Sequence, residues 1–411
     1  MNSVPTCRSC GQTPLTTVLS LGCTPLANAL RDETAADLPE PTFPLELAVC
    51  GRCSLAQLTT EVPPEVLFRE YVYFSSFSET MLQHAAHLAA ELIRQEQLGP
   101  SRLVVEAASN DGYLLKNYRA AGIPVLGIEP ARNIAQVAIE HHAIPTRTEF
   151  FSLELAKQLV REGLRADVFH AHNVLAHVPD LNGFVAGIHT LLKPTGVAVI
   201  EVPYVRDMLE QCEFDTIYHE HLCYFSLTAL VECFQRQGLV IRDVQRVPIH
   251  GGSLRLFAAP VEGGPAVSSR VTALLAEEAR WGVATLEPYR AFAQKVRTIQ
   301  HELRAFLTHL KAQGKRIAAY GASAKGSTLL NSCGIGAEVI DFVVDRSPVK
   351  QGKYTPGTRL KIYSPDQLLH TQPDYTLLLT WNFAEEILRQ QAEYRRRGGK
   401  FIVPVPQLRV A

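Results

Sequence analysis

The segment Tyr218-His219-Glu220-His221 places a phenol, a carboxylate and two imidazoles in four consecutive positions. Such a group can supply a proton acceptor, a partner that orients it and a hydrogen-bond donor. A metal site and a purely structural polar cluster are the alternatives, because histidine and carboxylate also bind zinc or iron. The spacing of zinc proteases, His-Glu-x-x-His, is absent, since the two histidines flank a single glutamate. The segment therefore indicates acid–base chemistry, with the two alternatives open.

Four cysteines form a second candidate site, in two Cys-x-x-Cys pairs, Cys7 with Cys10 and Cys50 with Cys53. Each pair can direct two thiolates at one ion, and four thiolates suit tetrahedral zinc. Because the protein would fill all four ligand positions, this zinc would be structural. A redox pair normally opens a helix in a thioredoxin-like unit, and neither pair does so here. Unrelated core cysteines are the other alternative.

A loop of small residues follows a short apolar strand at residues 103–105 and offers a third candidate site. The residues available to a ligand there are Glu106, Ser109, Asn110, Asp111 and Gly112. A dinucleotide fold would need Gly-x-Gly-x-x-Gly to receive a pyrophosphate, whereas this loop has one glycine and two acids. The acids would repel a pyrophosphate but suit a ligand that carries an ammonium and a sulfonium. The loop therefore favours S-adenosylmethionine (SAM) over NAD.

Two later segments could extend this ligand site. Glu129 ends the next predicted strand, where a carboxylate can accept both ribose hydroxyls. The alternative is that Glu129 is a solvated strand end. Further along, three histidines lie within eight residues, His170, His172 and His177. A lone histidine at such an edge is usually structural, but three together indicate a functional role.

Strands that alternate with helices must position these loops. We predict strands at residues 103–105, 124–128, 167–170 and 196–202, with 239–241 and 254–257 at the sheet edge. Such alternation is typical of a parallel, doubly wound sheet. Helical periodicity predicts a helix at 76–97 and a long helical segment at 271–313. A smaller sheet follows, with strands at 316–320, 339–344, 375–379 and 401–403, so two Rossmann-like units stand in tandem.

The second unit carries a candidate site after its first strand. Gly321-Ala322-Ser323-Ala324-Lys325-Gly326 opens a helix, and small residues with a lysine can seat a phosphate there. The Gly-x-x-x-x-Gly-Lys-Ser/Thr pattern is incomplete, which argues against a nucleoside triphosphatase. We expect Lys325, with His250, Gly251 and Ser253 near the seam, to help hold a nucleotide diphosphate. The alternative is a degenerate unit that only packs.

The composition limits the classes of function. A chain of 411 residues can form two or three domains, and 46% hydrophobic residues can fill their cores. Its 40 basic and 41 acidic residues nearly cancel, which argues against a nucleic-acid partner. No apolar run approaches the ~20 residues of a membrane helix, and the N-terminus lacks a signal pattern. We therefore expect a cytoplasmic protein without a membrane partner.

Taken in order, these motifs resemble the three-domain, zinc-containing, SAM-dependent sugar C-methyltransferases, above all those acting at carbon 3 of dTDP-4-keto-deoxysugars. The resemblance covers essentially the whole chain. It is carried by the two cysteine pairs, Leu26-Ala27-Asn28, Tyr71 to Ser76, Glu106 to Gly112, His172 to Asp180, Tyr218 to Ser226, His250 to Arg255 and Gly321 to Gly326. It implies an α/β fold with a small N-terminal zinc-binding domain (1–70), a central class I SAM-methyltransferase (Rossmann-like) domain (71–265) and a C-terminal second Rossmann-like domain (266–411) that binds the sugar nucleotide.

The resemblance also implies a reaction: methylation of a nucleotide-linked 4-keto-6-deoxy sugar, with dTDP favoured, at a carbon beside the ketone. Carbon 3 is favoured over carbon 5, as in deoxysugar biosynthesis. A base must remove a proton from that carbon while donors stabilise the enolate oxygen. His221 is the expected base, with His219 as the other candidate. The expected helpers are Tyr218, Glu220, His177 and Tyr73, and Asn173 and Val174 are expected to lie beside the methionine part of SAM.

Two other classes of function stay open at this stage. One is a ligand-sensing protein built from a zinc ribbon and Rossmann units, which would have no need of a proton acceptor at residues 218–221. The other is a methyltransferase that acts on oxygen or nitrogen, which the position of the new methyl group would reveal. The resemblance implies a monomer whose partner is a small-molecule sugar nucleotide.

Overall fold

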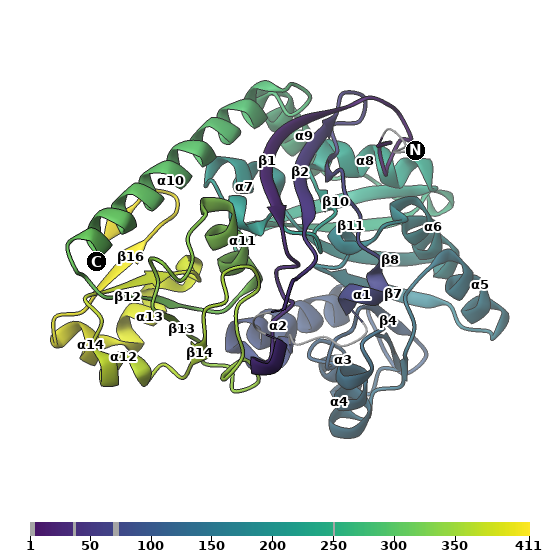
Figure 1. Cartoon of the computed structure of the whole chain (residues 1–411). Helices are drawn as coiled ribbons and strands as arrows, with labels where there is room; N and C mark the ends of the chain where they lie inside the picture. The colour runs from purple at the N-terminus through teal and green to yellow at the C-terminus, as the bar shows by residue number, and fades with distance from the viewer. Residues whose placement is uncertain (1–4, 36–37, 69–73, 250) are drawn as a thin grey trace.

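The computed structural model describes residues 5–35, 38–68, 74–249 and 251–411. Two residues with predicted roles, Tyr73 and His250, lie outside the described residues. Within the described ranges the longer strands form three sheets, of four, seven and six strands. The expected α/β architecture is confirmed, with a small N-terminal sheet between two larger α/β units (Figure 1).

The N-terminal sheet contains a strand from the middle of the chain. Its first strands are β1 (Leu15–Thr24), β2 (Phe43–Cys50) and β3 (Ala56–Leu58), all antiparallel. The fourth strand, β9 (Cys223–Tyr224), pairs with β3 and directly follows the Tyr-His-Glu-His segment. The N-terminal sheet therefore anchors one end of the segment predicted to do the chemistry.

The central sheet has the order β10-β11-β8-β7-β4-β5-β6. Its parallel strands are β4 (Val104–Ala107), β5 (Val125–Ile128), β6 (Thr146–Arg147), β7 (Ala166–His172) and β8 (Leu192–Pro203). Two antiparallel strands, β10 (Leu239–Val247) and β11 (Ser253–Pro260), close the other edge, as predicted. Strands covered on both faces read as nearly continuous apolar runs, which is why β4, β5 and β7 were recognisable in the sequence.

Helices cover both faces of the central sheet. One apolar core joins one face to α2 (Glu79–Gln95), α3 (Leu115–Ala120) and α4 (Arg132–His142). A second core joins the opposite face to α5 (Leu153–Arg161), α6 (Leu181–Leu191) and α8 (Leu227–Arg236). The carboxyl ends of the parallel strands remain at one edge, where such sheets bind their ligands.

The C-terminal sheet has the order β14-β13-β12-β15-β16-β17 and is parallel up to its last strand. Its strands are β12 (Ile317–Tyr320), β13 (Phe342–Val344), β14 (Ile362–Tyr363), β15 (Tyr375–Leu378), β16 (Lys400–Val403) and β17 (Arg409–Val410). Helix α11 (Ala324–Cys333) follows β12, as the second Rossmann-like unit predicts.

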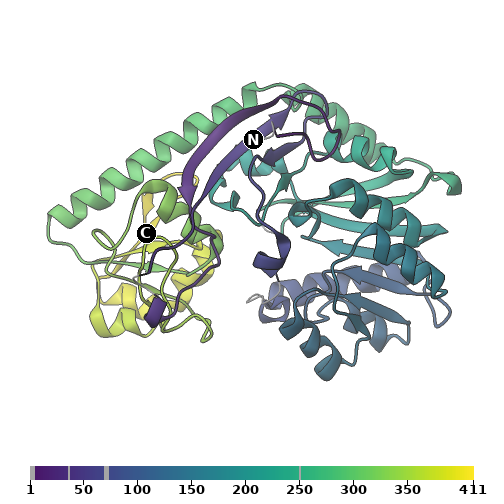
Figure 2. The same ribbon diagram turned by 45° about the vertical axis from the view of Figure 1, so that its right-hand side comes forward.

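The long helical segment predicted at residues 271–313 is two helices, α9 (Ser269–Trp281) and α10 (Glu287–Ala312). The break has a local cause. Gly282 ends α9 in a left-handed conformation, with φ of 89°, and Pro288 lies in the first turn of α10. Figure 2 shows α10 bridging the central and C-terminal units, with the β1–β2 hairpin beside it.

One apolar core connects all three parts of the chain. It contains Leu47 of the N-terminal sheet, Phe214 and Ile217 of the segment after β8, Leu303 of α10 and Leu329 of α11. Because these side chains are buried together, the segment around residues 214–217 belongs to the central unit in sequence but packs with the C-terminal unit. The domain boundaries drawn at residues 70 and 265 stay predictions.

Candidate active site

The four predicted zinc ligands converge. One sulfur atom from each of Cys7, Cys10, Cys50 and Cys53 lies within 4.8 Å of the others. Two tight turns point the thiols inward, because the N–H of Gly11 donates to the carbonyl of Cys7 and a matching bond follows Cys50. A hydrogen bond with Cys53 lowers the pKa of Cys7 to about 4, and the same bond raises the pKa of Cys53. Four buried or half-buried sulfurs without an open position fit a structural zinc, as predicted.

The four-cysteine cluster is hydrogen-bonded to the central unit. Asn182 of α6 donates its side-chain N–H to the carbonyls of Arg8 and Ser9, 3.0 Å away in each case. Arg236 of α8 donates to the hydroxyl of Ser9. These contacts attach the cysteine cluster to α6 and α8, in addition to the pairing of β3 with β9 from the central unit.

The loop after β4 has the shape of a ligand cradle. Ala108, Asn110 and Gly112 all have positive φ values, of 51°, 49° and 80°, so the backbone folds back on itself. A β-carbon on Gly112 would collide with Ile144, which explains the single glycine of the loop. Buried polar atoms of this loop and of Asn173 have no hydrogen-bond partner in the described structure: both carboxylate oxygens of Glu106, the hydroxyl of Ser109, Oδ1 of Asp111 and Oδ1 of Asn173.

Unsatisfied buried acceptors are rare in proteins and indicate a missing ligand or water. Burial raises the pKa of Glu106 well above its usual range, and the carboxylates of Glu129, Asp111 and Glu201 add to the effect. An ammonium or sulfonium ligand would relieve this repulsion, whereas a pyrophosphate would increase it. The residues present therefore fit SAM.

Glu129 is buried and is not a solvated strand end. Its two carboxylate oxygens accept the N–H groups of Asn110 and Ala131, each at 2.9 Å. Burial raises its pKa to about 7. Glu129 thus ties the loop after β4 to the loop after β5, and a ribose would have to share these oxygens.

The segment after residue 73 is fastened to the same cradle. The N–H of Ser75 donates to Oδ1 of Asn110 at 2.9 Å, and the N–H of Ser76 donates to Oδ2 of Asp111 at 3.2 Å. Ser75 lies at the start of the short helix η2 (Ser75–Phe77). The cofactor loop is therefore covered by the chain segment that follows the undescribed Tyr73.

Two of the three clustered histidines, His170 and His172, belong to a buried hydrogen-bond chain. Their nearest ring nitrogens are 2.8 Å apart, and Nδ1 of His172 lies 3.1 Å from Glu201. Because a carboxylate only accepts, His172 donates to Glu201, His170 donates to His172, and Tyr118 donates to His170 at 2.9 Å. Arg255 also binds Glu201, at 2.6 Å, and His172 and Arg255 together hold the pKa of this carboxyl well below its usual range. His170 and His172 therefore have a structural role in the interior of the central sheet.

His177, the third, lies beside the Tyr-His-Glu-His segment. Its ring centroid is 4.9 Å from that of His221, and the ring of Tyr218 is 4.1 Å from that of His221. Phe68 and Tyr224 border the group, at 5.4 Å from His177 and 6.4 Å from His221. The structure thus brings together three residues that were predicted to act on one substrate.

Hydrogen bonds to the backbone fix the tautomers of both histidines. Nδ1 of His177 lies 2.7 Å from the carbonyl oxygen of Glu220, and Nδ1 of His221 lies 2.8 Å from that of Thr216. A carbonyl only accepts, so both Nδ1 atoms carry hydrogen, and in the neutral rings Nε2 holds the lone pair. Burial lowers the pKa of His177 to about 4, which keeps it neutral.

The other two residues of the segment reach the N-terminal sheet. Asn28 donates its side-chain N–H to Glu220 at 2.7 Å. His219 is buried, its Nε2 donates to the carbonyl of Pro44 at 3.3 Å, and its ring packs on Phe43. His219 therefore contacts β2, whereas His221 contacts His177. This arrangement supports His221 over His219 as the base.

Two of the predicted substrate residues, Lys325 and Gly251, meet at the seam with the C-terminal unit. Nζ of Lys325 lies 3.5 Å from Glu213, whose carboxylate also lies against Gly251. Ser253 donates its hydroxyl to the carbonyl of Ile249 at 3.0 Å and is buried. Val174 is half-buried beside the second core of the central unit. A diphosphate at Lys325 would have to compete with Glu213.

Several residues at the site had no assigned role in the sequence: Asn28, Phe68, Asp215, Tyr224 and Trp381. Asn28 stands in a recognisable motif, but its partner Glu220 is 192 residues away in the chain. Nothing in the local spacing around Trp381 indicates that it reaches Asp215. Contacts at such separations become visible only after folding.

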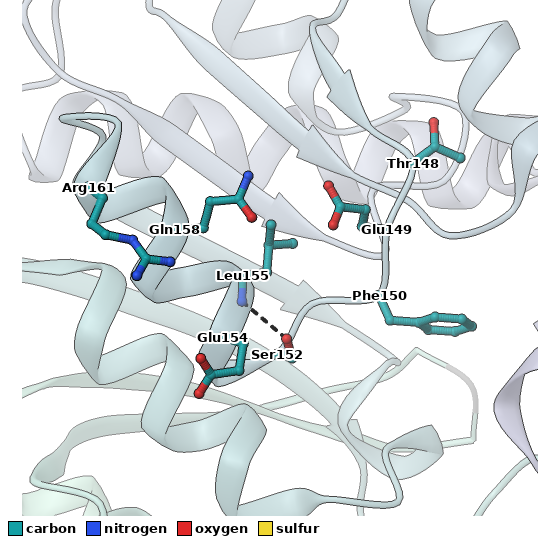
Figure 3. A pocket seen from close by; sticks show the side chains of 8 residues that line it. All are labelled: Thr148, Glu149, Phe150, Ser152, Glu154, Leu155, Gln158 and Arg161. Atoms are coloured by element: carbon teal, nitrogen blue, oxygen red, sulfur yellow. Dashed lines mark hydrogen bonds between the residues drawn. The ribbon is translucent and has the colours of Figure 1, made fainter.

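A surface hollow lies over the loop after β6 and the start of α5 (Figure 3). Thr148, Glu149 and Phe150 come from the loop, while Gln158 and Arg161 project from the helix. None of the residues predicted to carry the chemistry lines it. No described helix is long and apolar enough to cross a membrane.

Comparison with known proteins covers nearly the whole chain. Residues 7–68 match a zinc binding domain family, residues 81–244 a methyltransferase domain family, and residues 248–406 the C-methyltransferase C-terminal domain family. The chain is also 41% identical over 406 residues to the C-methyltransferase NovU of Streptomyces niveus, covering 98% of this chain and 96% of that protein.

Solved structures are similar only in part. Magnesium protoporphyrin IX methyltransferase from Synechocystis PCC 6803 aligns with 44% of this chain and 83% of its own, at 16% identity and a TM-score of 0.36. A methyltransferase from Clostridium acetobutylicum aligns with 44% of this chain and 92% of its own, at 10% identity and a TM-score of 0.35.

Proposed function

This chain belongs to the SAM-dependent C-methyltransferases, and we propose that it methylates a nucleotide-linked 4-keto-6-deoxy sugar at a carbon beside the ketone. We favour a dTDP-linked sugar and carbon 3 over carbon 5. The relative NovU is a C-methyltransferase, so transfer to carbon agrees with the family. A role in deoxysugar biosynthesis, a cytoplasmic location and a monomeric state belong to the same proposal.

The observation that carries the proposal is the pair of histidines at the centre of the site. His177 and His221 lie 4.9 Å apart, and both donate Nδ1–H to a backbone carbonyl, which leaves Nε2 as the basic nitrogen. A hydrogen on a carbon beside a ketone is weakly acidic, so its removal needs a base near neutral pH. Histidine meets that need, because its unperturbed pKa is about 6.5.

We assign proton removal to Nε2 of His221. The ring of Tyr218 lies against it and offers a phenol, which can donate to the ketone oxygen as negative charge develops there. His177 stays neutral through its low pKa and borders the same space. Glu220, held by Asn28, fixes the backbone carbonyl that orients His177. Tyr73 and His219 keep supporting roles in this proposal.

The loop after β4 supplies the acidic side chains of the proposed cofactor site. Glu106, Asp111 and Asn173 would receive the amino-acid end of SAM, and Glu129 the ribose. Ser109, Asn110, Gly112 and Val174 would complete the cradle. When bound, SAM supplies the methyl group to the carbon that His221 has deprotonated.

The sugar nucleotide would reach the site from the seam with the C-terminal unit. Lys325 and Gly251 already lie together around Glu213 there, and Ser253 begins β11 two residues after Gly251. His250 would join them in this proposal. Lys325 would bind a diphosphate oxygen in exchange for Glu213. The lysine therefore serves both the domain contact and the substrate in this proposal.

The experiment that tests this function is incubation with labelled SAM and a dTDP-4-keto-2,6-dideoxyhexose. We expect a mass gain of one methyl group on the sugar nucleotide, with the new methyl on a ring carbon by NMR. A methyl on oxygen or nitrogen would overturn the enolate mechanism. Binding of both ligands without any transfer, across several keto-sugar nucleotides, would overturn the assignment of the substrate.

A further inference from the structure

The residues just before the Tyr-His-Glu-His segment are held by the C-terminal unit. Asp215 lies in the short helix η4 (Phe214–Thr216) and is fully buried. The indole Nε1 of Trp381 donates to its Oδ2 at 2.6 Å. Trp381 opens the short helix η6 (Trp381–Phe383), directly after β15 of the C-terminal sheet. This hydrogen bond joins residues 166 positions apart.

Further contacts attach residues 213–217 to the C-terminal unit. Nζ of Lys325, in the first turn of α11, lies 3.5 Å from Oε2 of Glu213 and 5.3 Å from the centre of the Trp381 ring. Phe214 and Ile217, on either side of Asp215, are buried in the core that contains Leu329 and Trp381. Within the described residues, the indole is the side-chain donor to the carboxylate of Asp215, and the backbone N–H groups of Asp215 and Thr216 are the local donors. The indole therefore ties this carboxylate to the C-terminal unit.

The attachment leads straight to the proposed base. Thr216 follows Asp215, and its carbonyl oxygen accepts the Nδ1–H of His221 at 2.8 Å. This bond holds the imidazole in the tautomer with the lone pair on Nε2 and fixes the direction of that lone pair. A shift of η4 would therefore move the acceptor on which the tautomer of His221 depends.

We propose that Trp381, through Asp215 and the carbonyl of Thr216, is a positioning residue for His221. The C-terminal Rossmann-like unit then has a task besides substrate binding, since it places the acceptor that orients the base. This inference rests on the proposed role of His221. It does not require that the unit bind a nucleotide.

The test replaces the indole donor and measures proton abstraction on its own. In D2O, with S-adenosylhomocysteine in the cofactor site, the full-length enzyme should exchange the hydrogen beside the ketone of a dTDP-4-keto-6-deoxyglucose for deuterium. For Trp381→Phe we expect exchange and kcat to fall by about 10- to 100-fold, since small misplacements of reacting groups have effects of this size. The affinity for S-adenosylhomocysteine should stay unchanged. The matched control is Trp281→Phe, because Trp281 stacks on Arg206 at the edge of the same apolar core, whereas Asp215 is bonded to Trp381.

The pH dependence separates positioning from a loss of folded protein. The hydrogen bond to Thr216 favours the imidazolium, so weakening it should move the acidic limb of the exchange profile to lower pH. A smaller fraction of folded enzyme would lower the whole profile without moving the limb. Unchanged exchange and an unmoved limb in Trp381→Phe would overturn the inference.

Two variants of Asp215 test the same link from the other side. Asp215→Asn keeps an oxygen that accepts from Trp381 and should exchange at nearly the wild-type rate per folded molecule, whereas Asp215→Leu should match Trp381→Phe. Equal rates in both would overturn the inference even if Trp381→Phe failed to fold. The proposed base is tested independently, because persistent exchange in His221→Asn would refute that assignment alone.

Discussion

The Nδ1–H of His221 is donated to the backbone carbonyl of Thr216, five residues earlier in the chain, over a distance of 2.8 Å. The bond leaves Nε2 as the basic atom of the neutral ring. A side chain four or five positions from its acceptor would normally be free to choose other partners. Here η4 and β9 hold both ends of the segment, so the same bond becomes a fixed part of the site.

The first prediction concerns the base. His221→Asn should lower kcat by at least about 100-fold, because general-base catalysis contributes factors of roughly 10² to 10⁴. The affinity for SAM, measured by calorimetry, should remain within error of the wild type, because His221 is not part of the cofactor loop after β4. His189→Asn is the matched control, since His189 lies at the surface beside Glu262. Normal turnover of His221→Asn would refute its assignment as base.

The second prediction separates the two histidines of the segment. His219→Asn should lower the free energy of unfolding by about 1–3 kcal/mol, because it removes a buried ring and its bond to Pro44. Turnover per folded molecule should fall far less than in His221→Asn. Measurement of kcat at a temperature well below the melting midpoint checks this. Complete loss of turnover in a stably folded His219→Asn would make His219 the base.

The third prediction is a proton linkage in cofactor binding. Burial and neighbouring carboxylates raise the pKa of Glu106, so the empty protein holds a proton that a cationic ligand must displace. SAM binding should release protons, and affinity should rise with pH until Glu106 is ionised in the free protein. Calorimetry in buffers of different ionisation enthalpy counts the protons. Glu106→Gln should reduce this release and weaken binding by about 10- to 100-fold, as expected for a lost charged hydrogen bond.

The exposed residue Glu140 supplies the control for that experiment, because Glu140→Gln changes a surface carboxylate on α4 without touching the loop. Proton release equal to that of the wild type in Glu106→Gln would assign the linkage to another group, such as Glu129.

The fourth prediction is the pH dependence of stability without SAM. The pKa of Glu129 is about 7 in the folded protein and about 4.5 in the unfolded chain. The folded state therefore binds more protons in this window, and stability should fall as pH rises from about 4.5 to about 7. Thermal unfolding between pH 5 and 8 should show a decreasing midpoint from this group. A saturating concentration of SAM should flatten the trend if a ribose shares the Glu129 oxygens.

The fifth prediction concerns zinc. Removal of the metal with a chelator, or Cys50→Ser, should lower the melting midpoint and reduce activity, because structural zinc sites contribute directly to folding. The expected loss of activity follows because β3 of the N-terminal sheet pairs with β9, which lies beside the proposed base. Cys23→Ser is the control, since Cys23 is exposed and outside the cluster. An unchanged melting midpoint after complete metal removal would contradict a structural role.

Much of the fold could be predicted from the sequence because the relevant signals are local. Buried parallel strands such as β4, β5 and β7 are short apolar runs, and Gly112 marks the turn of the cofactor loop. Each cysteine pair forms its own local turn, and folding only has to bring the two pairs together. The helical segment at 271–313 was predicted as one stretch, because the effect of Gly282 on a helix depends on its conformation, which periodicity does not reveal.

The histidines show where local signals end. The sequence alone does not distinguish His170, His172 and His177. In the structure, His170 and His172 point into the interior of the sheet, where they form hydrogen bonds with Tyr118 and Glu201. Only His177, beyond the end of β7, reaches His221. Which of several equivalent side chains reaches a site depends on the direction in which the backbone leaves the strand.

By itself the sequence determined the chemistry that the chain can offer: four thiols for a metal, acids around a small-residue loop for a cation, and histidines for proton transfer. The tertiary structure decided which atoms meet. Asn28, Pro44, His177 and Trp381 come from every part of the chain, and each holds the segment at 213–221 in place. Such contacts arise from the packing of whole units on a shared core, so their partners cannot be read from spacing along the chain.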